Sequence, residues 1–264
     1  MWPPTSRRQS GRDTTRRRVD EPSPLLTYAQ TVTTRDVLQV RELAIRFGRT
    51  EVFSALSFNV ARADALAIIG PNGSGKTMLL RALIGALPFD GTIDWAPDVR
   101  LGYVPQKLDI GRDAPITAFE FLRARAALAR TPLADVRTPL AAVGLPLETG
   151  TRPIGALSGG QFQRLLVAFA LIGEPNVLLL DEPTASVDEP GQEQLNELIH
   201  RLQRDRGLTV ILVSHDLSVV YRYATAVLCL GRQTHCFGPP REILTPERLQ
   251  ELYGSTPVFH VHDS

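Results

Sequence analysis

Eight consecutive residues carry the clearest chemical signal in the chain, and their sequence is Gly70-Pro71-Asn72-Gly73-Ser74-Gly75-Lys76-Thr77. They match the pattern G-x-x-x-x-G-K-S/T, which binds the phosphates of a nucleotide. Because glycine lacks a Cβ atom, the backbone can take positive φ and turn several N–H groups toward a polyphosphate. The lysine would then reach the outer phosphates as a point charge, and the threonine hydroxyl would bind Mg²⁺.

The residues on either side predict the strand and the helix that such a phosphate loop requires. Ala65–Ile69 is an apolar run typical of a buried strand, and Met78–Ile84 has helical spacing. The positive N-terminal end of this helix, near Lys76, adds to the attraction for an anion. The glycine order does not match the dinucleotide pattern G-x-G-x-x-G. A tight glycine turn with a solvated lysine is the alternative, and the agreement of motif and context disfavours it.

Two carboxylates follow a second apolar run. Val177–Leu180 shows no alternation, which indicates a strand covered on both faces as in a parallel sheet. Asp181 and Glu182 come next, at the end of the strand where open α/β sheets bind ligands. We expect Asp181 to hold Mg²⁺ and Glu182 to polarise the water that attacks the γ-phosphate. Adjacent acids after a strand are commonly a solvated turn, but together with the phosphate loop they predict an NTPase.

Two more polar residues stand at the ends of predicted strands. Gln106 follows the short strand 99–104, and its amide group could bind a metal ion or a water molecule. His215 follows the buried strand 208–213, and its imidazole could hydrogen-bond the γ-phosphate and hold the water and Glu182 in position. Alone, each could be an ordinary loop residue, so their position after core strands is what favours catalysis.

The segment Leu157–Gln161 is a second potential phosphate site. Ser158 is a good helix N-cap, and an apolar face follows it with helical spacing. Gly159 and Gly160 at the head of the helix leave backbone N–H groups uncovered, which favours anion binding. A flexible glycine loop before an amphipathic helix is the alternative, and it would be preferred if the chain had no phosphate loop.

The remaining pattern predicts the frame around these residues. Two strands, 37–47 and 52–60, form a small antiparallel β layer. Phe47, at the end of the first, could stack on adenine or simply pack in the core. Residues 107–156 are a helical insertion. The further predictions are a hairpin turn at Asp90-Gly91, helix divisions at Pro132, Pro139 and Pro146, a helix 193–206 closed by Gly207, closing strands 226–230 and 233–237, and a last helix that Thr245 and Pro246 begin and Gly254 ends.

The bulk properties exclude several classes of protein. The chain has 264 residues and a net charge of +1, so no overall field favours nucleic acid or a membrane surface. Its longest strongly apolar runs are far shorter than the ~20 residues that span a bilayer. Cys229 and Cys236 provide neither a disulfide framework nor zinc spacing, which favours a reducing compartment. We expect no integral membrane segment and no nucleic-acid partner.

The two ends of the chain carry weaker signals. Residues 1–34 hold six arginines among Pro, Ser and Thr, with no apolar segment after them, so they predict a disordered basic extension and no export signal. Contact of this extension with lipid headgroups or nucleic acid is the less favoured alternative. His260 and His262 could share a weak metal ion, although solvated tail residues are favoured.

Taken together, these motifs resemble the ATPase subunit of an ATP-binding-cassette (ABC) transporter from about Val37 to Gly254. The phosphate loop corresponds to Walker A and the run Val177–Glu182 to Walker B. Leu157–Gln161 is similar to the family signature. The other matches are Phe47 for adenine stacking, Gln106 at the Q-loop, Asp188 at the D-loop and His215 as the switch histidine.

The resemblance implies a P-loop NTPase of α/β class, with a RecA-like core, a small antiparallel β subdomain and a helical subdomain at about 107–170. The ATPase domain would span 35–255, before a tail at 256–264. Its cofactors would be ATP and Mg²⁺. A second copy would supply Ser158, Gly159, Gly160, Gln161 and Asp188 across an ATP whose phosphates meet the loop residues and Met78 of the first.

The resemblance also implies partners and a location: integral membrane permease subunits, an extracytoplasmic metal-binding lipoprotein, and the cytoplasmic face of the cell membrane. Residues 104–107, 115–121 and 235–240 resemble the zinc and manganese importer branch. Phe169 departs from the family, since many relatives carry arginine there. The alternatives are an importer or exporter of another substrate, a soluble cassette ATPase acting on ribosomes or DNA, and a nucleotide-gated module without hydrolysis, which Glu182 disfavours.

Overall fold

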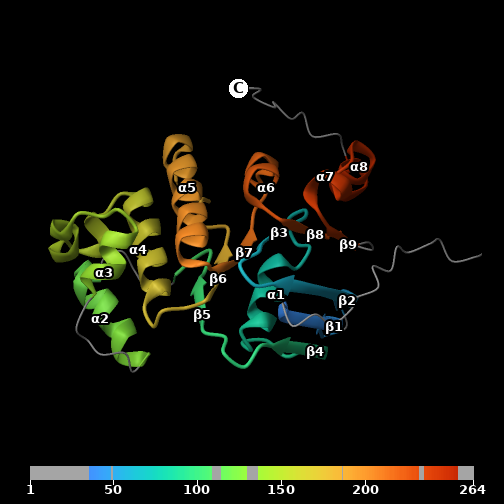
Figure 1. Ribbon diagram of the computed structural model, residues 1–264, viewed down its shortest axis with the longest axis horizontal. Helices are drawn as coiled ribbons and strands as arrows, with labels where there is room; N and C mark the ends of the chain where they lie inside the picture. The colour runs from blue at the N-terminus through green and yellow to red at the C-terminus, as the bar shows by residue number, and fades with distance from the viewer. Residues whose placement is uncertain are drawn as a thin grey trace, which may run out of the picture. The chain divides into compact units, whose positions relative to one another are not determined.

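The computed structural model describes residues 36–48, 50–108, 114–129, 136–185, 187–231 and 235–254 (Figure 1). The predictions for the arginine-rich extension and for His260 and His262 lie outside these ranges. None of the helices within them is long and apolar enough to cross a membrane.

A six-stranded sheet forms the centre of the described chain. Its order is β5 (Leu101–Val104), β6 (Val177–Asp181), β7 (Thr209–Val213), β3 (Ala65–Ile69), β8 (Ala226–Leu230) and β9 (His235–Gly238). All neighbours are parallel except β8 and β9. Every residue of β3 and β6 is buried, as strands covered on both faces must be. This is the predicted α/β core.

A second sheet holds three antiparallel strands in the order β2 (Thr50–Ala61), β1 (Asp36–Phe47) and β4 (Asp90–Trp95). One apolar cluster joins it to the large sheet through α1 (Lys76–Leu83). The predicted antiparallel layer is therefore confirmed. Because this layer packs against α1, it also fixes the start of the helix that follows the phosphate loop.

The predicted hairpin turn at Asp90-Gly91 is wrong, because both residues belong to β4. Gly91 takes φ +96°, and a Cβ atom there would come within 2.6 Å of the Arg41 carbonyl oxygen. The pairing of β1 with β4 is irregular between Arg41 and Ala44. The glycine therefore permits a bulge in the sheet rather than a turn. The sequence around Gly91 does not show this bulge, because the bulge forms against β1, a strand about 50 residues earlier in the chain.

The helical insertion comprises α2 (Ala118–Leu128), α3 (Arg137–Ala142), two 3-10 helices (Leu147–Thr151 and Ile154–Ala156) and α4 (Gly159–Leu171). All of these elements except Leu147–Thr151 share an apolar cluster with β5, β6 and α5 (Glu189–Arg206). Pro139 does not divide helices as predicted, because it lies in the first turn of α3, where proline is tolerated.

Three helices belong to the C-terminal part of the chain. Helix α6 (Leu217–Tyr223) lies between β7 and β8 in the sequence, and α7 (Pro240–Ile243) and α8 (Pro246–Tyr253) follow β9. The cap predictions are confirmed, since Gly207 and Gly254 end α5 and α8 in the left-handed conformation and Thr245 caps α8. Helix α5 begins at Glu189, four residues earlier than predicted, because Pro190 fits its first turn.

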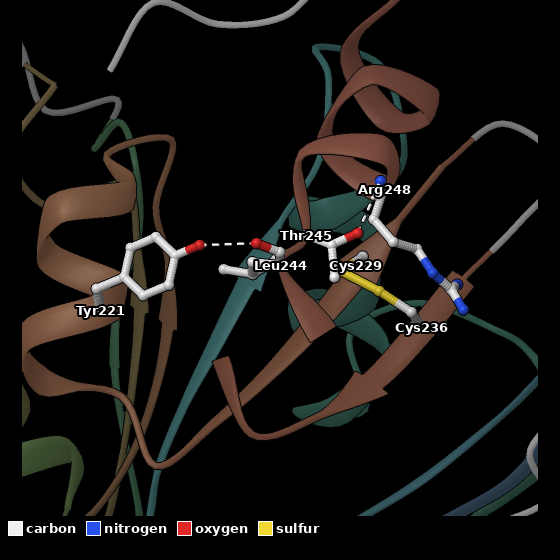
Figure 2. The surroundings of a disulfide bond; sticks show 6 residues. All are labelled: Tyr221, Cys229, Cys236, Leu244, Thr245 and Arg248. Carbon is white, nitrogen blue, oxygen red and sulfur yellow. Dashed lines mark hydrogen bonds between the residues drawn. A yellow bond between two sulfur atoms is a disulfide. The ribbon is translucent and has the colours of Figure 1, made fainter. Parts of the chain in front are cut away.

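The expectation that the two cysteines form no disulfide is wrong. Cys229 on β8 and Cys236 on β9 are register partners with a Cα–Cα distance of 4.9 Å, and their sulfur atoms are bonded (Figure 2). Residue spacing alone did not show this pairing, because it depends on the register of a hairpin.

Candidate active site

The phosphate loop connects β3 to α1 and is surrounded by other parts of the chain. Gly70 has φ +152°, and a Cβ atom there would overlap the carbonyl oxygen of Leu230 at the end of β8. Gly75 has φ +94°, and its Cβ would come within 2.5 Å of the Val52 side chain on β2. Both positions therefore require glycine. The loop backbone is thus fixed from the large sheet on one side and from the small sheet on the other.

Lys76 is buried beneath this loop. Its ammonium group donates hydrogen bonds to the carbonyl oxygens of Gly70, at 2.9 Å, and Pro71, at 3.2 Å, and lies 4.0 Å from a Glu182 carboxylate oxygen. Burial lowers the pKa of Lys76, while the carboxylates of Glu182 and Asp181 act in the opposite direction. Contact with an anion would therefore stabilise this ammonium group, because the carbonyl oxygens that accept its hydrogen bonds carry no net charge.

Thr77 and Asp181 form the next pair along the site. The Thr77 hydroxyl donates to Asp181 Oδ1 at 3.2 Å, while Asp181 Oδ2 is buried and has no hydrogen-bond partner among the described residues. Burial raises the pKa of Asp181, and the Thr77 hydrogen bond partly offsets that effect. A buried carboxylate oxygen with unused lone pairs, beside a hydroxyl, fits a hard cation that prefers oxygen ligands. The donor set therefore fits Mg²⁺.

The described residues hold no cluster of three or more His, Cys, Asp or Glu that could bind a metal ion.

Gln106 and Glu182 are joined directly. Gln106 Nε2 donates to Glu182 Oε2 at 2.7 Å, although the residues are 76 positions apart in the sequence. They meet because β5 and β6 are parallel neighbours, so their carboxyl ends lie at the same edge. Glu182 has φ +46°, an uncommon conformation for a residue with a side chain. Glu182 is thereby held between the amide of Gln106 and the ammonium of Lys76.

His215 lies at the same edge without joining this network. It follows β7, which pairs with both β6 and β3, and it is exposed. Within the described residues it makes no hydrogen bond. Asp216 next to it caps α6 through the amide of Ser218, at 2.8 Å.

In the part of the chain that the structure describes, the polar groups of the segment 157–161 hydrogen-bond one another rather than the phosphate loop. Ser158 Oγ accepts from the Gln161 amide at 3.2 Å, and Gln161 Oε1 accepts from the Ser158 amide at 3.1 Å. Ser158 is exposed, and α4 packs in a different apolar cluster from α1. Within the described residues, no hydrogen bond links Ser158, Gly159 or Gly160 to the phosphate loop.

The other predicted contact residues are scattered. Asp188 is exposed at the N-terminal end of α5, and within the described ranges its side chain makes no capping bond. Met78 is half-buried against the cluster between the sheets, and Asn72 is exposed. Phe47 ends β1, and the position of its side chain lies outside the described part of the chain.

Sequence reasoning missed three residues near the site. Tyr253 of α8 lies at the phosphate loop: burial raises the pKa of its hydroxyl, and the Gly70 backbone acts in the opposite direction. Tyr103 and Arg81 interact electrostatically with Asp181. Burial and the Asp181 carboxylate raise the pKa of Tyr103, whereas Arg81 lowers the pKa values of both Tyr103 and Asp181. No sequence signal identifies these residues, because each depends on contacts between distant segments.

Comparisons with known proteins agree with the geometry. The profile of the family described as ABC transporter matches residues 53–185. A protein of Cereibacter sphaeroides named zinc import ATP-binding protein ZnuC is 42% identical over 83% of this chain and 88% of its own. The ZnuC of Pseudomonas putida is 36% identical over 86% of this chain and 88% of its own.

A solved structure is similar as well. CbiO1 of Clostridium perfringens, part of the ABC transporter complex CbiONQ, superposes with a TM-score of 0.70 at 26% identity. That match covers 81% of this chain and 93% of CbiO1. With one relative above 40% identity over most of both chains and a family profile across both nucleotide motifs, the family prediction is confirmed: the chain belongs to the ABC transporter family and is an ATP-binding ATPase of that family.

Proposed function

We propose that this chain is the ATPase subunit that drives zinc import through a membrane permease. The observation that carries the proposal is its similarity, over more than four fifths of its length, to relatives named for zinc import. The contacts of Lys76 and Glu182 support the ATPase part independently of those names.

The roles of the site residues follow from their contacts. The phosphates of ATP replace the carbonyl oxygens of Gly70 and Pro71 at the Lys76 ammonium, so the buried charge exchanges neutral partners for anionic ones. Thr77, Asp181 and Gln106 would hold Mg²⁺, which would supply positive charge to offset that of the phosphates. Glu182 accepts a proton from the attacking water, and His215, at the same edge, hydrogen-bonds the γ-phosphate.

The working form is a dimer of two copies. The uncovered amides at the head of α4 suit an anion, yet in the described part of the chain they have no bond to the phosphate loop. We assign Ser158, Gly159 and Gly160, with Gln161 and Asp188, to the ATP bound by the other copy. Phe47 stacks on the adenine. Each ATP then bridges two chains, and hydrolysis releases them.

ABC ATPase subunits of importers pair with membrane permease components, and we place this chain at the cytoplasmic face of the membrane beside such a permease. A metal-binding lipoprotein delivers the ion from outside. The ATPase domain spans 35–255 and its helical subdomain about 107–170, between a basic extension at 1–34 and a tail at 256–264.

Transport in vesicles tests the proposal. The chain is reconstituted with the permease encoded beside its gene, and ATP-dependent uptake of zinc, manganese and iron is measured. We expect zinc uptake that Glu182→Gln abolishes, while Arg204→Ala, on the exposed end of α5, leaves it unchanged. Uptake of manganese or iron without zinc would contradict the zinc assignment, and absence of ATP-driven uptake of any ion would contradict metal import.

A further inference from the structure

The Cys229–Cys236 bond lies one strand away from the phosphate loop. Cys229 is the register partner of Cys236 on one side and of Ile69 on the other. Ile69 directly precedes Gly70, the first residue of the loop. The bond therefore links β9, the last strand of the sheet, to β8, and β8 in turn pairs with β3, the strand that leads into the loop.

Leu230, the residue after Cys229, forms one wall of the loop. Its carbonyl oxygen is so close to Gly70 that only a glycine fits there. The chain then passes from Leu230 to Cys236 within six residues, so the disulfide closes a short hairpin directly beside this wall. A displacement of Leu230 would change the space in which the Gly70 backbone sits.

The C-terminal helices pack on the same unit. Cys229, Ile69 and Leu249 of α8 belong to one apolar cluster, with Cys236 and Tyr253 against it. The Tyr221 hydroxyl donates to the Leu244 carbonyl at 2.8 Å, and Thr245 caps α8 through the Arg248 amide at 3.3 Å (Figure 2). The hairpin, α8 and the base of the phosphate loop therefore share one packed cluster, so movement of the hairpin affects the loop.

The sulfur atoms differ in access. Cys229 is 4% exposed, whereas Cys236 is half-buried. A cavity beside the bond is lined by both cysteines together with His235, Arg248 and Glu251. A guanidinium group near a thiol favours the thiolate, which is the reactive form in thiol–disulfide exchange. Because Cys236 is the more exposed of the two cysteines, it is the sulfur that an external thiol reaches, and Cys229 is its buried partner.

We propose that the Cys229–Cys236 pair is a reversible thiol–disulfide switch that sets how tightly the phosphate loop binds ATP. With the bond closed, Leu230 is held against Gly70 and the loop is preorganised for phosphate. With the bond open, β8 and β9 remain paired by their backbone hydrogen bonds, but the hairpin gains freedom and the loop loses part of its support. Gln106, Glu182 and His215 follow β5, β6 and β7, away from the hairpin, and are not changed.

The exchange balances with a dithiol of the thioredoxin class as reductant. Its thiolate attacks Cys236 Sγ, forming a mixed disulfide and releasing Cys229 as a thiolate that takes up a proton. The second thiol of the reductant then attacks its own mixed-disulfide sulfur and releases Cys236. Two electrons and two protons pass to the protein, and the reductant becomes a disulfide. Oxidised glutathione reverses the reaction through two thiol exchanges.

Nucleotide binding to the full chain tests the proposal. The protein is prepared with oxidised glutathione or with dithiothreitol, its thiols are counted by alkylation and mass measurement, and ATP binding and hydrolysis are measured. We expect the reduced chain to bind ATP about fivefold more weakly, at the low end of typical coupling between two sites. The KM for ATP should rise in parallel, while kcat changes less than twofold.

Two variants separate a switch from a structural bond. Cys229→Ser/Cys236→Ser should bind ATP like the reduced chain and should not respond to dithiothreitol; Cys229→Ala/Cys236→Ala serves if the serines disturb folding. Arg248→Gln should keep both affinities but slow the exchange. Equal ATP affinities in the two redox states, a response to dithiothreitol that persists without the cysteines, or thiols that stay free in oxidised glutathione would each overturn the proposal.

Discussion

The phosphate loop and the segment 157–161 both precede a helix and both present backbone N–H groups, but they differ in what surrounds them. Around the loop, Lys76, Gln106 and Glu182 meet from three separate parts of the chain. At the head of α4, Ser158 and Gln161 hydrogen-bond each other, and among the described residues no distant side chain bonds to either of them. The first region therefore holds its chemical groups together before any ligand binds. The second is a capped helix end whose described neighbours include no part of the phosphate loop, and the proposal assigns it to a second copy.

The largest expected effect comes from removing the charge in the first region. Lys76→Ala should weaken ATP binding about 100-fold, because truncating one member of a buried charged contact leaves the other without a partner. Calorimetric titration with ATP measures this change. Arg204→Ala, exposed at the end of α5, is the control and should leave affinity unchanged. Unaltered ATP affinity in Lys76→Ala would mean that the loop is not the phosphate site.

The next effect separates binding from chemistry within the same region. Glu182→Gln keeps the size of the side chain and an oxygen that can accept from Gln106, so ATP should still bind. Turnover should fall about 1000-fold, as expected when a general base is lost. Single-turnover assays of γ-phosphate release measure the rate. A variant that hydrolyses ATP at the normal rate would remove Glu182 from the role of base.

The second region is tested by a pair of matched caps. Ser158→Ala and Thr117→Ala each remove the hydroxyl of a capping box, at α4 and α2. Each should lower stability by about 1 kcal/mol. Only Ser158→Ala should also reduce kcat, about tenfold, because it loses a hydrogen bond to a charged phosphate. Equal losses of activity in the two variants would mean that Ser158 acts only as a helix cap and makes no contact with phosphate.

The smallest expected effect concerns stability and pH. Burial raises the pKa of Asp181 above its value in the unfolded chain, so folding favours the protonated carboxyl group. This contribution to stability is fully present at low pH and is lost as the pH rises through the folded pKa. At neutral pH the ionised carboxylate therefore destabilises the nucleotide-free fold. Asp181→Asn should therefore raise the Tm by about 2–4 °C at pH 7. The gain should shrink as the pH falls toward 4. Thermal unfolding without nucleotide or Mg²⁺ checks this, and a lower Tm at pH 7 would contradict it.

Features that depend on neighbouring residues were predictable from the sequence. The phosphate loop lies between a strand and a helix as its pattern requires, and Gly207, Thr245 and Gly254 end or begin helices where their backbone preferences suggest. The ends of strands could be located as well, which placed Gln106 and Glu182 in advance. Their hydrogen bond then follows from the adjacency of β5 and β6.

Features that depend on strand register or on distant packing were not predictable. Gly91 and Gly70 both take positive φ, yet one permits a bulge against Arg41 and the other a close approach to Leu230. The bond between Cys229 and Cys236 requires the register of β8 and β9, and Tyr253 reaches the phosphate loop from the other end of the chain. A single sequence contains no local signal for such contacts.

The mass of the Glu182→Gln chain in solution tests most directly whether a second copy completes the site. Light scattering is measured with Mg²⁺ alone and with Mg²⁺ and ATP, beside a chain that also carries Ser158→Ala. The account predicts twice the single-chain mass only when ATP is present, and a weaker dimer in the double variant. A single-chain mass in saturating ATP, together with normal hydrolysis by the unaltered chain at the same concentration, would contradict it.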